Sequence, residues 1–143
     1  MKPNVSVIIP VYNTEKLLSR CLQTVTEQSL TNIEIICVND GSTDNSLDVL
    51  QKWADKDNRI VVINQANGRQ GKARNAAMAV AKGEYIGMID SDDYIPANYF
   101  EKLYNAAVTN NAEIAICGII KEKPAGNRTV IEFKESTVAT TTQ

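Results

Sequence analysis

The chain has 143 residues, a length typical of one domain with a sizeable hydrophobic core. Fifteen Lys and Arg residues against 17 Asp and Glu residues give a net charge of −2, which argues against a nucleic-acid partner. With 43% hydrophobic and 22% charged residues the chain is not disordered, and because it has no histidine it cannot use a catalytic histidine or a His-ligated zinc.

The three cysteines, Cys21, Cys37 and Cys117, lack the CxxC spacing of a zinc cluster, and their odd number argues against a disulfide framework. Reduced thiols on apolar faces are expected instead, which agrees with a cytoplasmic location. No apolar run approaches the roughly 20 residues of a membrane span, so the sequence predicts no transmembrane segment in this chain. The apolar run near the N-terminus is too short and too interrupted for a signal peptide.

Short β-branched runs alternate with amphipathic segments along the chain. Strands are predicted, in chain order, at Val5–Ile9, Ile33–Val38, Ile60–Ile63, Tyr85–Ile89 and Ile114–Cys117, with a further candidate at Thr129–Phe133. The helices predicted between them are one capped by Asn13 or Thr14, one capped by Asp44 or Asn45, one over Lys72–Ala81 and one over Ala97–Val108. Pro10 is expected to end the first strand. Strands separated by such helices predict βαβ units and a mainly parallel sheet.

The pattern changes after Gly118. The segment Lys121–Arg128 is charged and contains Pro124 and Gly126, and the last eight residues are polar and rich in threonine. We expect residues 1–118 to form the core and residues 119–143 to be the incomplete start of a further region. On this interpretation the chain ends before the architecture closes and is a fragment of a longer protein.

Polar residues follow the predicted strands, at the edge where open α/β sheets bind ligands. They are Tyr12 and Asn13 after the first strand, Asp40 after the second, Asn67 after the third and the segment Asp90–Asp93 after the fourth. A lone carboxylate such as Asp40 is as often a turn residue as a ligand. Three aspartates within four residues repel each other unless a cation lies nearby, and carboxylate oxygens suit Mg²⁺ or Mn²⁺.

Other nucleotide-binding arrangements are disfavoured by what the sequence lacks. The chain contains neither a phosphate-binding loop with its lysine nor a GxGxxG segment after the first strand. A metal-dependent phosphohydrolase or receiver-like domain would need an acidic cluster directly after that strand, where the chain has Pro10–Asn13. The residues therefore indicate a nucleotide diphosphate bound through a metal and aspartates.

Several short motifs together resemble the family 2 glycosyltransferases of GT-A fold. In order, over residues 5–96, they are Val5–Asn13, Val38–Asp44, Asn67–Gly68, Ala73–Asn75, Gly83–Ile86 and the DxD-type segment Asp90–Asp93. The resemblance implies an α/β, Rossmann-like GT-A fold with a mainly parallel sheet flanked by helices, truncated in this chain.

The resemblance also implies a donor site. Its binding residues would be Pro10, Tyr12, Asn13, Asp40, Asn67, Arg74, Asp90, Ser91 and Asp92. Asp40 would accept a hydrogen bond from the base N–H, as uracil offers, and Asp90 would hold the ribose hydroxyls. Asp92 would be the metal ligand, for Mn²⁺ or Mg²⁺. Asp93 is a weaker candidate for the donor site, because capping the turn toward Pro96 is an equally good role for it.

The implied function is transfer of a sugar from a nucleotide-diphosphate donor, a UDP-sugar, to an acceptor hydroxyl on a saccharide, a lipid-linked molecule or a protein. The resemblance implies an inverting, metal-dependent reaction in polysaccharide biosynthesis, at the inner membrane face or in the cytoplasm. The catalytic base is expected beyond residue 143, since Glu132 and Glu135 lie in no matching motif. The alternative is a non-catalytic nucleotide-sugar-binding module or an inactive fragment of a longer enzyme.

Overall fold

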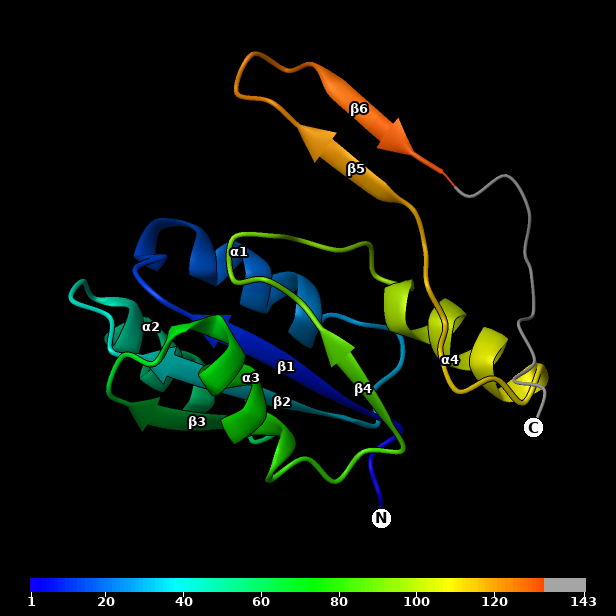
Figure 1. Cartoon of the computed structure of the whole chain (residues 1–143), viewed down its shortest axis with the longest axis horizontal. Helices are drawn as coiled ribbons and strands as arrows, with labels where there is room; N and C mark the ends of the chain where they lie inside the picture. Colours follow the sequence, from blue (N-terminus) through cyan, green and yellow to red (C-terminus); the bar gives the residue numbers. More distant parts are fainter. Residues whose placement is uncertain (133–143) are drawn as a thin grey trace. The chain divides into compact units, whose positions relative to one another are not determined.

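The structure is a computed structural model that describes residues 1–132, and the chain divides into two compact units, Met1–Glu101 and Lys102–Gln143. The strands of the first unit are β1 (Val5–Val11), β2 (Ile33–Asp40), β3 (Ile60–Gln65) and β4 (Tyr85–Met88) (Figure 1). Its helices are α1 (Glu15–Thr26), α2 (Ser46–Ala54) and α3 (Arg69–Met78), and α4 (Tyr99–Thr109) begins in it. Within residues 1–132, no helix is both long enough and apolar enough to cross a membrane.

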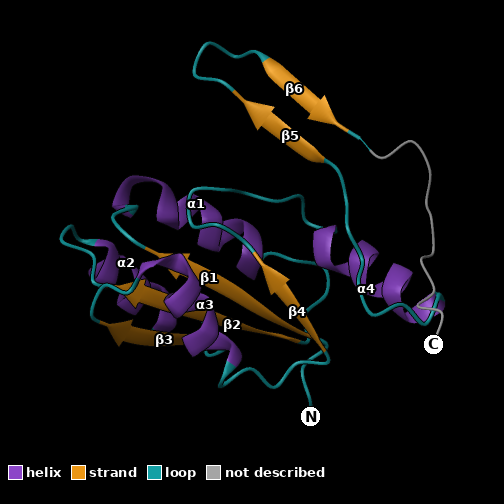
Figure 2. Cartoon of the chain, viewed as in Figure 1, coloured by secondary structure: helices purple, strands orange, loops and turns teal. Residues whose placement is uncertain are grey.

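The first unit is a parallel sheet in the order β3-β2-β1-β4 with helices on both faces, as Figure 2 shows. Ala73 and Ala77 of α3 pack on one face, against a cluster that includes Ile8 and Ile36. The chain crosses the sheet in one direction from β1 through β2 to β3, and α3 then carries it back to β4 on the other side of β1. Because such crossovers are right-handed, α1 and α2 lie together on the face opposite α3. The predicted α/β architecture with a mainly parallel sheet is thus confirmed.

Strand β1 continues through Pro10, so the prediction that Pro10 ends it is wrong. The Ile8 carbonyl accepts a hydrogen bond from the Ile89 N–H on the β4 side. Groups two residues apart along a strand point to the same side, so the N–H that Pro10 lacks would also face that side. Because β4 ends at Met88, proline removes no ladder hydrogen bond there.

Two other strands are longer than their apolar runs, and one helix is displaced. Strand β2 runs to Asp40 and β3 runs to Gln65, since their polar last residues still pair with each other in the ladder. Helix α3 begins at Arg69, three residues before the predicted Lys72, and ends at Met78 rather than Ala81. Strands and helices of this chain therefore include polar end residues that the pattern of apolar residues does not predict.

In the second unit, the strand predicted at Ile114–Cys117 is wrong, because these residues have no regular structure. Strands β5 (Ile119–Glu122) and β6 (Arg128–Ile131) form an antiparallel pair instead. The turn between them is closed by a hydrogen bond from the Gly126 N–H to the Lys123 carbonyl, at 2.9 Å. Pro124 and Gly126 therefore lie in the turn of a β-hairpin. Phe133, the last residue of the further strand candidate, lies outside the described residues.

The turn after β2 packs directly on the loop after β3, and Gly41 makes this approach possible. Gly41 has φ 72°, in the left-handed region that favours glycine. A Cβ atom built there would lie 2.6 Å from the backbone nitrogen of Asn67. Gly41 therefore holds the ends of β2 and β3 together at the carboxyl edge of the sheet.

Replacing Gly41 by alanine should lower the free energy of unfolding by about 1–3 kcal/mol, through left-handed strain and the clash with Asn67. Gly71→Ala is the matched control, because a Cβ at this helical position meets no atom within 4 Å. It should stabilise the protein by about 0.5–1 kcal/mol. Urea denaturation followed by circular dichroism measures both variants, and equal midpoints for the two would contradict this account of Gly41.

Candidate functional site

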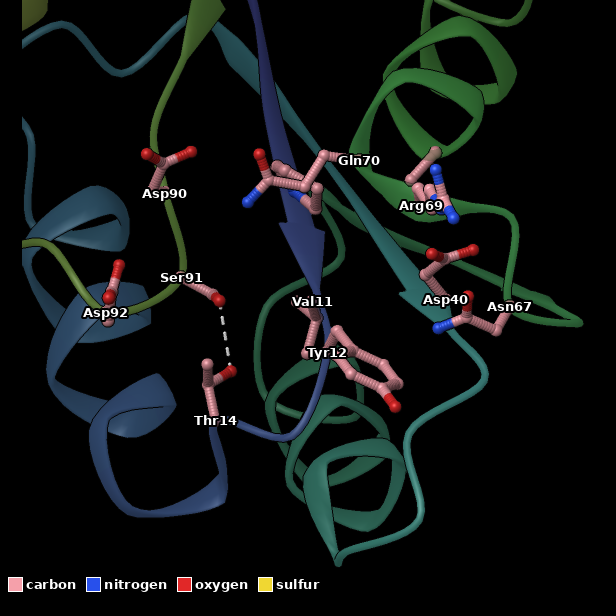
Figure 3. Close-up of a pocket in the computed structure, with 12 residues that line it drawn as sticks. Val11, Tyr12, Thr14, Asp40, Asn67, Arg69, Gln70, Asp90, Ser91 and Asp92 are labelled. Atoms are coloured by element: carbon pink, nitrogen blue, oxygen red, sulfur yellow. Dashed lines mark hydrogen bonds between the residues drawn. The ribbon is translucent and has the colours of Figure 1, made fainter.

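A pocket of about 520 Å³ lies at the carboxyl ends of β1, β2 and β4, in the first unit. It is lined by Pro10, Val11, Tyr12, Thr14, Asp40, Asn67, Arg69, Gln70, Ala73, Asp90, Ser91 and Asp92. Figure 3 shows Asp40 and Asn67 on one side of the end of β1 and Asp90, Ser91 and Asp92 on the other. The strand order reverses at β1, which is the position where open α/β sheets bind their ligands.

Seven of the nine predicted donor-binding residues line this pocket, and Asn13 and Arg74 are not among its lining residues. The prediction missed Val11, Thr14, Arg69, Gln70 and Ala73. The predicted helix begins only at Lys72, whereas Arg69 and Gln70 form the first turn of α3, which opens onto the pocket. Taking Gly68 as the N-cap of the helix would have placed Arg69 and Gln70 in its first turn. Val11 and Thr14 adjoin predicted residues in the sequence.

Asp40 is the buried acceptor of the pocket, with only 3% of its surface exposed. Its Oδ1 atom accepts two hydrogen bonds of 2.8 Å, one from Nε2 of Gln65 and one from the Gly68 N–H. An ionised carboxylate has acceptor capacity on both oxygens, so the second oxygen can still receive a ligand N–H.

Asn13 ties the loop after β1 to the loop after β2. It has φ 51°, a left-handed conformation that asparagine tolerates. Its Oδ1 atom accepts from the backbone N–H groups of Thr43 (2.7 Å) and Asp44 (3.3 Å), and its own N–H donates to Oγ of Ser42 (3.1 Å). These contacts fix the backbone on which the exposed Tyr12 enters the pocket.

The first turns of α1 and α2 cap each other across the same junction. The Glu15 N–H donates to Oδ2 of Asp44 (3.1 Å), and the Asn45 N–H donates to Oε2 of Glu15 (2.8 Å). The Thr14 N–H donates to Oγ of Ser46 (3.0 Å). Burial raises the pKa of Asp44, but hydrogen bonds from Ser46 and Glu15 outweigh it and hold the pKa below its ordinary value. Each helix thus satisfies N–H groups of the other that have no intrahelical acceptor.

The acidic segment that follows β4 is fastened along α1. The fastening hydrogen bonds run from Thr14 Oγ1 to Ser91 Oγ (3.0 Å), from the Ile95 N–H to Thr24 Oγ1 (3.3 Å) and from Gln28 Nε2 to the Pro96 carbonyl (2.7 Å). The guanidinium carbon of Arg20 also lies 3.5 Å from the centre of the Tyr94 ring. These contacts hold three neighbouring carboxylates in place despite their mutual repulsion.

One of these three charges is paired with a cation. Nη2 of Arg74 lies 2.9 Å from Oδ1 of Asp90, so Arg74 acts on the site through this carboxylate. Burial, together with the charges of Asp92 and Asp90, raises the pKa of Asp93. Burial and the same acidic segment raise the pKa of the Cys21 thiol to about 12, so this cysteine stays protonated. The segment therefore keeps an excess of negative charge.

Among residues 1–132 no group of three or more metal-binding side chains is arranged to hold an ion unaided. Asp92 nevertheless offers an exposed, hard carboxylate on the wall of the pocket. Mg²⁺ is commonly bound by one or two carboxylates together with substrate phosphates and water. The donor set therefore fits a divalent ion that arrives with a diphosphate.

Comparison with known proteins gives consistent matches. The profile of Glycosyl transferase family 2 matches residues 6–137. The uncharacterized glycosyltransferase EpsJ of Bacillus subtilis (strain 168) is 43% identical over 122 residues, which are 85% of this chain and 36% of EpsJ. The structure of S. aureus TarS 1–349 in complex with UDP-GlcNAc is 34% identical with a TM-score of 0.70, covering 78% of this chain and 32% of the TarS 1–349 chain.

A mannosyltransferase, PcManGT from Pyrobaculum calidifontis in complex with GDP-Man and Mn²⁺, is 28% identical with a TM-score of 0.65. That match covers 75% of this chain and 32% of the mannosyltransferase. The chain spans about a third of the length of these relatives. These likenesses confirm the GT-A fold that the sequence motifs imply, and by the family match over residues 6–137 the chain belongs to glycosyltransferase family 2.

Proposed function

We propose that this chain binds the donor of a glycosyltransferase that transfers a sugar from a UDP-sugar to an acceptor hydroxyl. The observation that carries the proposal is that Asp40 and Asp92 line one pocket from opposite sides of the end of β1. Asp40 supplies an acceptor for a base N–H, and Asp92 supplies a ligand for a cation that the diphosphate shares. A nucleoside diphosphate carries both of these groups in one molecule.

At the base end, Asp40 accepts the N3–H of uracil while Tyr12 and Asn67 border the ring. The pocket is polar on this side, and the buried carboxylate would be left unsatisfied by a base that presents an acceptor. The UDP-GlcNAc complex of TarS, at 34% identity, supports a uridine donor. The GDP-Man complex of the mannosyltransferase makes GDP the natural comparison ligand.

At the diphosphate end, Asp90 holds the ribose hydroxyls beside Ser91, and Asp92 holds Mn²⁺ or Mg²⁺. A bound metal would neutralise the charge that develops on the leaving diphosphate. Arg74 orients Asp90 through their ion pair. Asn13 fixes the loop that carries Tyr12, so both residues support donor binding without lining the pocket.

The reaction we propose is a single displacement at the anomeric carbon with inversion, on a saccharide, lipid-linked or protein acceptor. It needs a carboxylate that removes the proton of the acceptor hydroxyl. We assign that base to none of the residues 1–132. A nucleotide-sugar-binding module without catalysis is the competing function, and the two differ in whether donor binding is accompanied by turnover.

Calorimetry with UDP-, GDP-, CDP- and dTDP-sugars, with and without Mn²⁺, tests the proposal. UDP-sugars should bind most tightly, and Mn²⁺ should strengthen their binding. Measuring released UDP with a mixture of saccharide acceptors then separates the transferase from the binding module. A chain that binds none of the four donors would refute the proposed function.

Asp92→Ala should remove the dependence of UDP binding on Mn²⁺ and leave the fold intact, because the exposed side chain contributes little to packing. Calorimetric titrations with UDP, in the presence of Mn²⁺ and in its absence, give the two affinities. Asp93→Ala is the matched control, since Asp93 is the third aspartate of the segment and does not line the pocket. The assignment is wrong if Asp92→Ala binds UDP with unchanged metal dependence.

Asp40→Ala should weaken UDP binding about tenfold to a hundredfold, because losing a charged hydrogen-bond partner costs about 1.5–3 kcal/mol. Asp40→Asn should cost less, since its amide oxygen can still accept. Isothermal titration with UDP measures both affinities, and thermal melting checks that each variant is folded. Wild-type affinity in folded Asp40→Ala would show that Asp40 has only a structural role at the end of β2.

A further inference from the structure

We infer that Gln65 is a positioning residue for base selection, which it performs by orienting the carboxylate of Asp40. The inference rests on the proposed function, because it concerns the same nucleotide pocket. Gln65 is the last residue of β3 and does not line the pocket itself. It reaches the ligand only through Asp40.

The register of the sheet places the two side chains together. Asp40 pairs with Gln65 at the last position of the β2–β3 ladder, and paired residues of neighbouring strands face the same side of a sheet. Nε2 of Gln65 donates to Oδ1 of Asp40 at 2.8 Å. The Gly68 N–H donates to the same atom at 2.8 Å, from the loop that leads into α3.

These two donors use both lone pairs of Oδ1. Within the described part of the chain no donor reaches Oδ2 of Asp40, so Oδ2 is the oxygen left for a ligand. Because only 3% of the Asp40 surface is exposed, water has little room to replace either donor. Gln65 thereby fixes which oxygen faces the ligand and in which plane the carboxylate lies.

An oriented carboxylate discriminates among bases by whether the group that faces it donates or accepts a hydrogen bond. Uracil presents an N–H at N3, which can donate to Oδ2. Cytosine presents a lone pair at N3, which repels Oδ2 and leaves this buried oxygen without a hydrogen-bond donor. A site whose buried polar groups are unpaired by the wrong ligand rejects that ligand more strongly than a site whose groups can turn away. Gln65 prevents Asp40 from turning away.

The residue beside Gln65 provides a matched control. Asn64 pairs with Asn39 in the same ladder, and Nδ2 of Asn39 donates to Oδ1 of Asn64 at 2.8 Å. This amide pair lies on the other face of the sheet, because side chains alternate along a strand. Neither residue lines the pocket. Losing the Asn64 amide removes a similar hydrogen bond from the same strand end without touching Asp40.

The experiment compares the affinities of UDP and CDP for the wild-type chain, Gln65→Met and Asn64→Leu, by calorimetry in Mn²⁺. Methionine keeps the length of Gln65 and removes its donor. Gln65→Asn, whose amide is one methylene too short to reach Asp40, serves as a second variant should the methionine variant not fold. The preference for UDP over CDP should fall about tenfold in Gln65→Met or Gln65→Asn and stay at the wild-type value in Asn64→Leu.

The ratio of affinities is informative because damage to the fold would weaken both nucleotides alike. A wild-type ratio in folded Gln65→Met or Gln65→Asn would overturn the inference, and so would an equal loss of preference in Asn64→Leu. A wild-type chain that binds neither nucleotide would refute the proposed function, and the role of Gln65 with it. Binding of UDP with an unaltered ratio in the Gln65 variants would refute the role of Gln65 alone.

Discussion

The burial of β1 is the constraint on which the rest of the first unit depends. Every residue from Val5 to Val11 is buried, and the strand pairs with β2 on one edge and β4 on the other. Such a strand cannot shift without exposing apolar surface on both faces and breaking two ladders. The chain must therefore leave the sheet at one fixed point after Val11. Asp40, the last residue of β2, and Asp90, two residues after the end of β4, lie on opposite sides of that point.

The acidic segment after β4 is held against its own repulsion. Hydrogen bonds to α1 fix its backbone, and Arg74 pairs with Asp90. The raised pKa of Asp93 means that its charged form is less favourable in the folded chain than in the unfolded chain. The segment consequently reduces stability as the pH rises through that pKa. A cation bound nearby would lower the repulsion, so stability and ligand affinity are linked through the same carboxylates.

The sequence was sufficient to locate the first four strands along the chain and most of the pocket, because apolar runs mark buried strands and ligands bind where such strands end. It was insufficient where polar residues continue a strand or start a helix. Gln65 and Arg69 read as loop residues by periodicity, although pairing with Asp40 keeps Gln65 in β3. The apolar run 114–117 read as a strand, since an apolar run alone does not reveal whether a partner strand is in register beside it. Hydrogen bonds such as that from Gly68 to Asp40 join residues far apart in the sequence, and no local pattern encodes them.

The mutual capping of α1 and α2 has a consequence for the thermodynamics of ligand capture. The loop that carries Tyr12 and the loop that follows Asp40 are joined through Glu15 and Asp44 without help from a ligand. On the proposed function, a nucleotide would find this half of the pocket already ordered, so little backbone entropy would be lost there on association. The heat of binding at the base end should then report mainly the new hydrogen bonds and stacking. Substitutions around the sugar, beyond the diphosphate, would then change sugar specificity without weakening binding of the base.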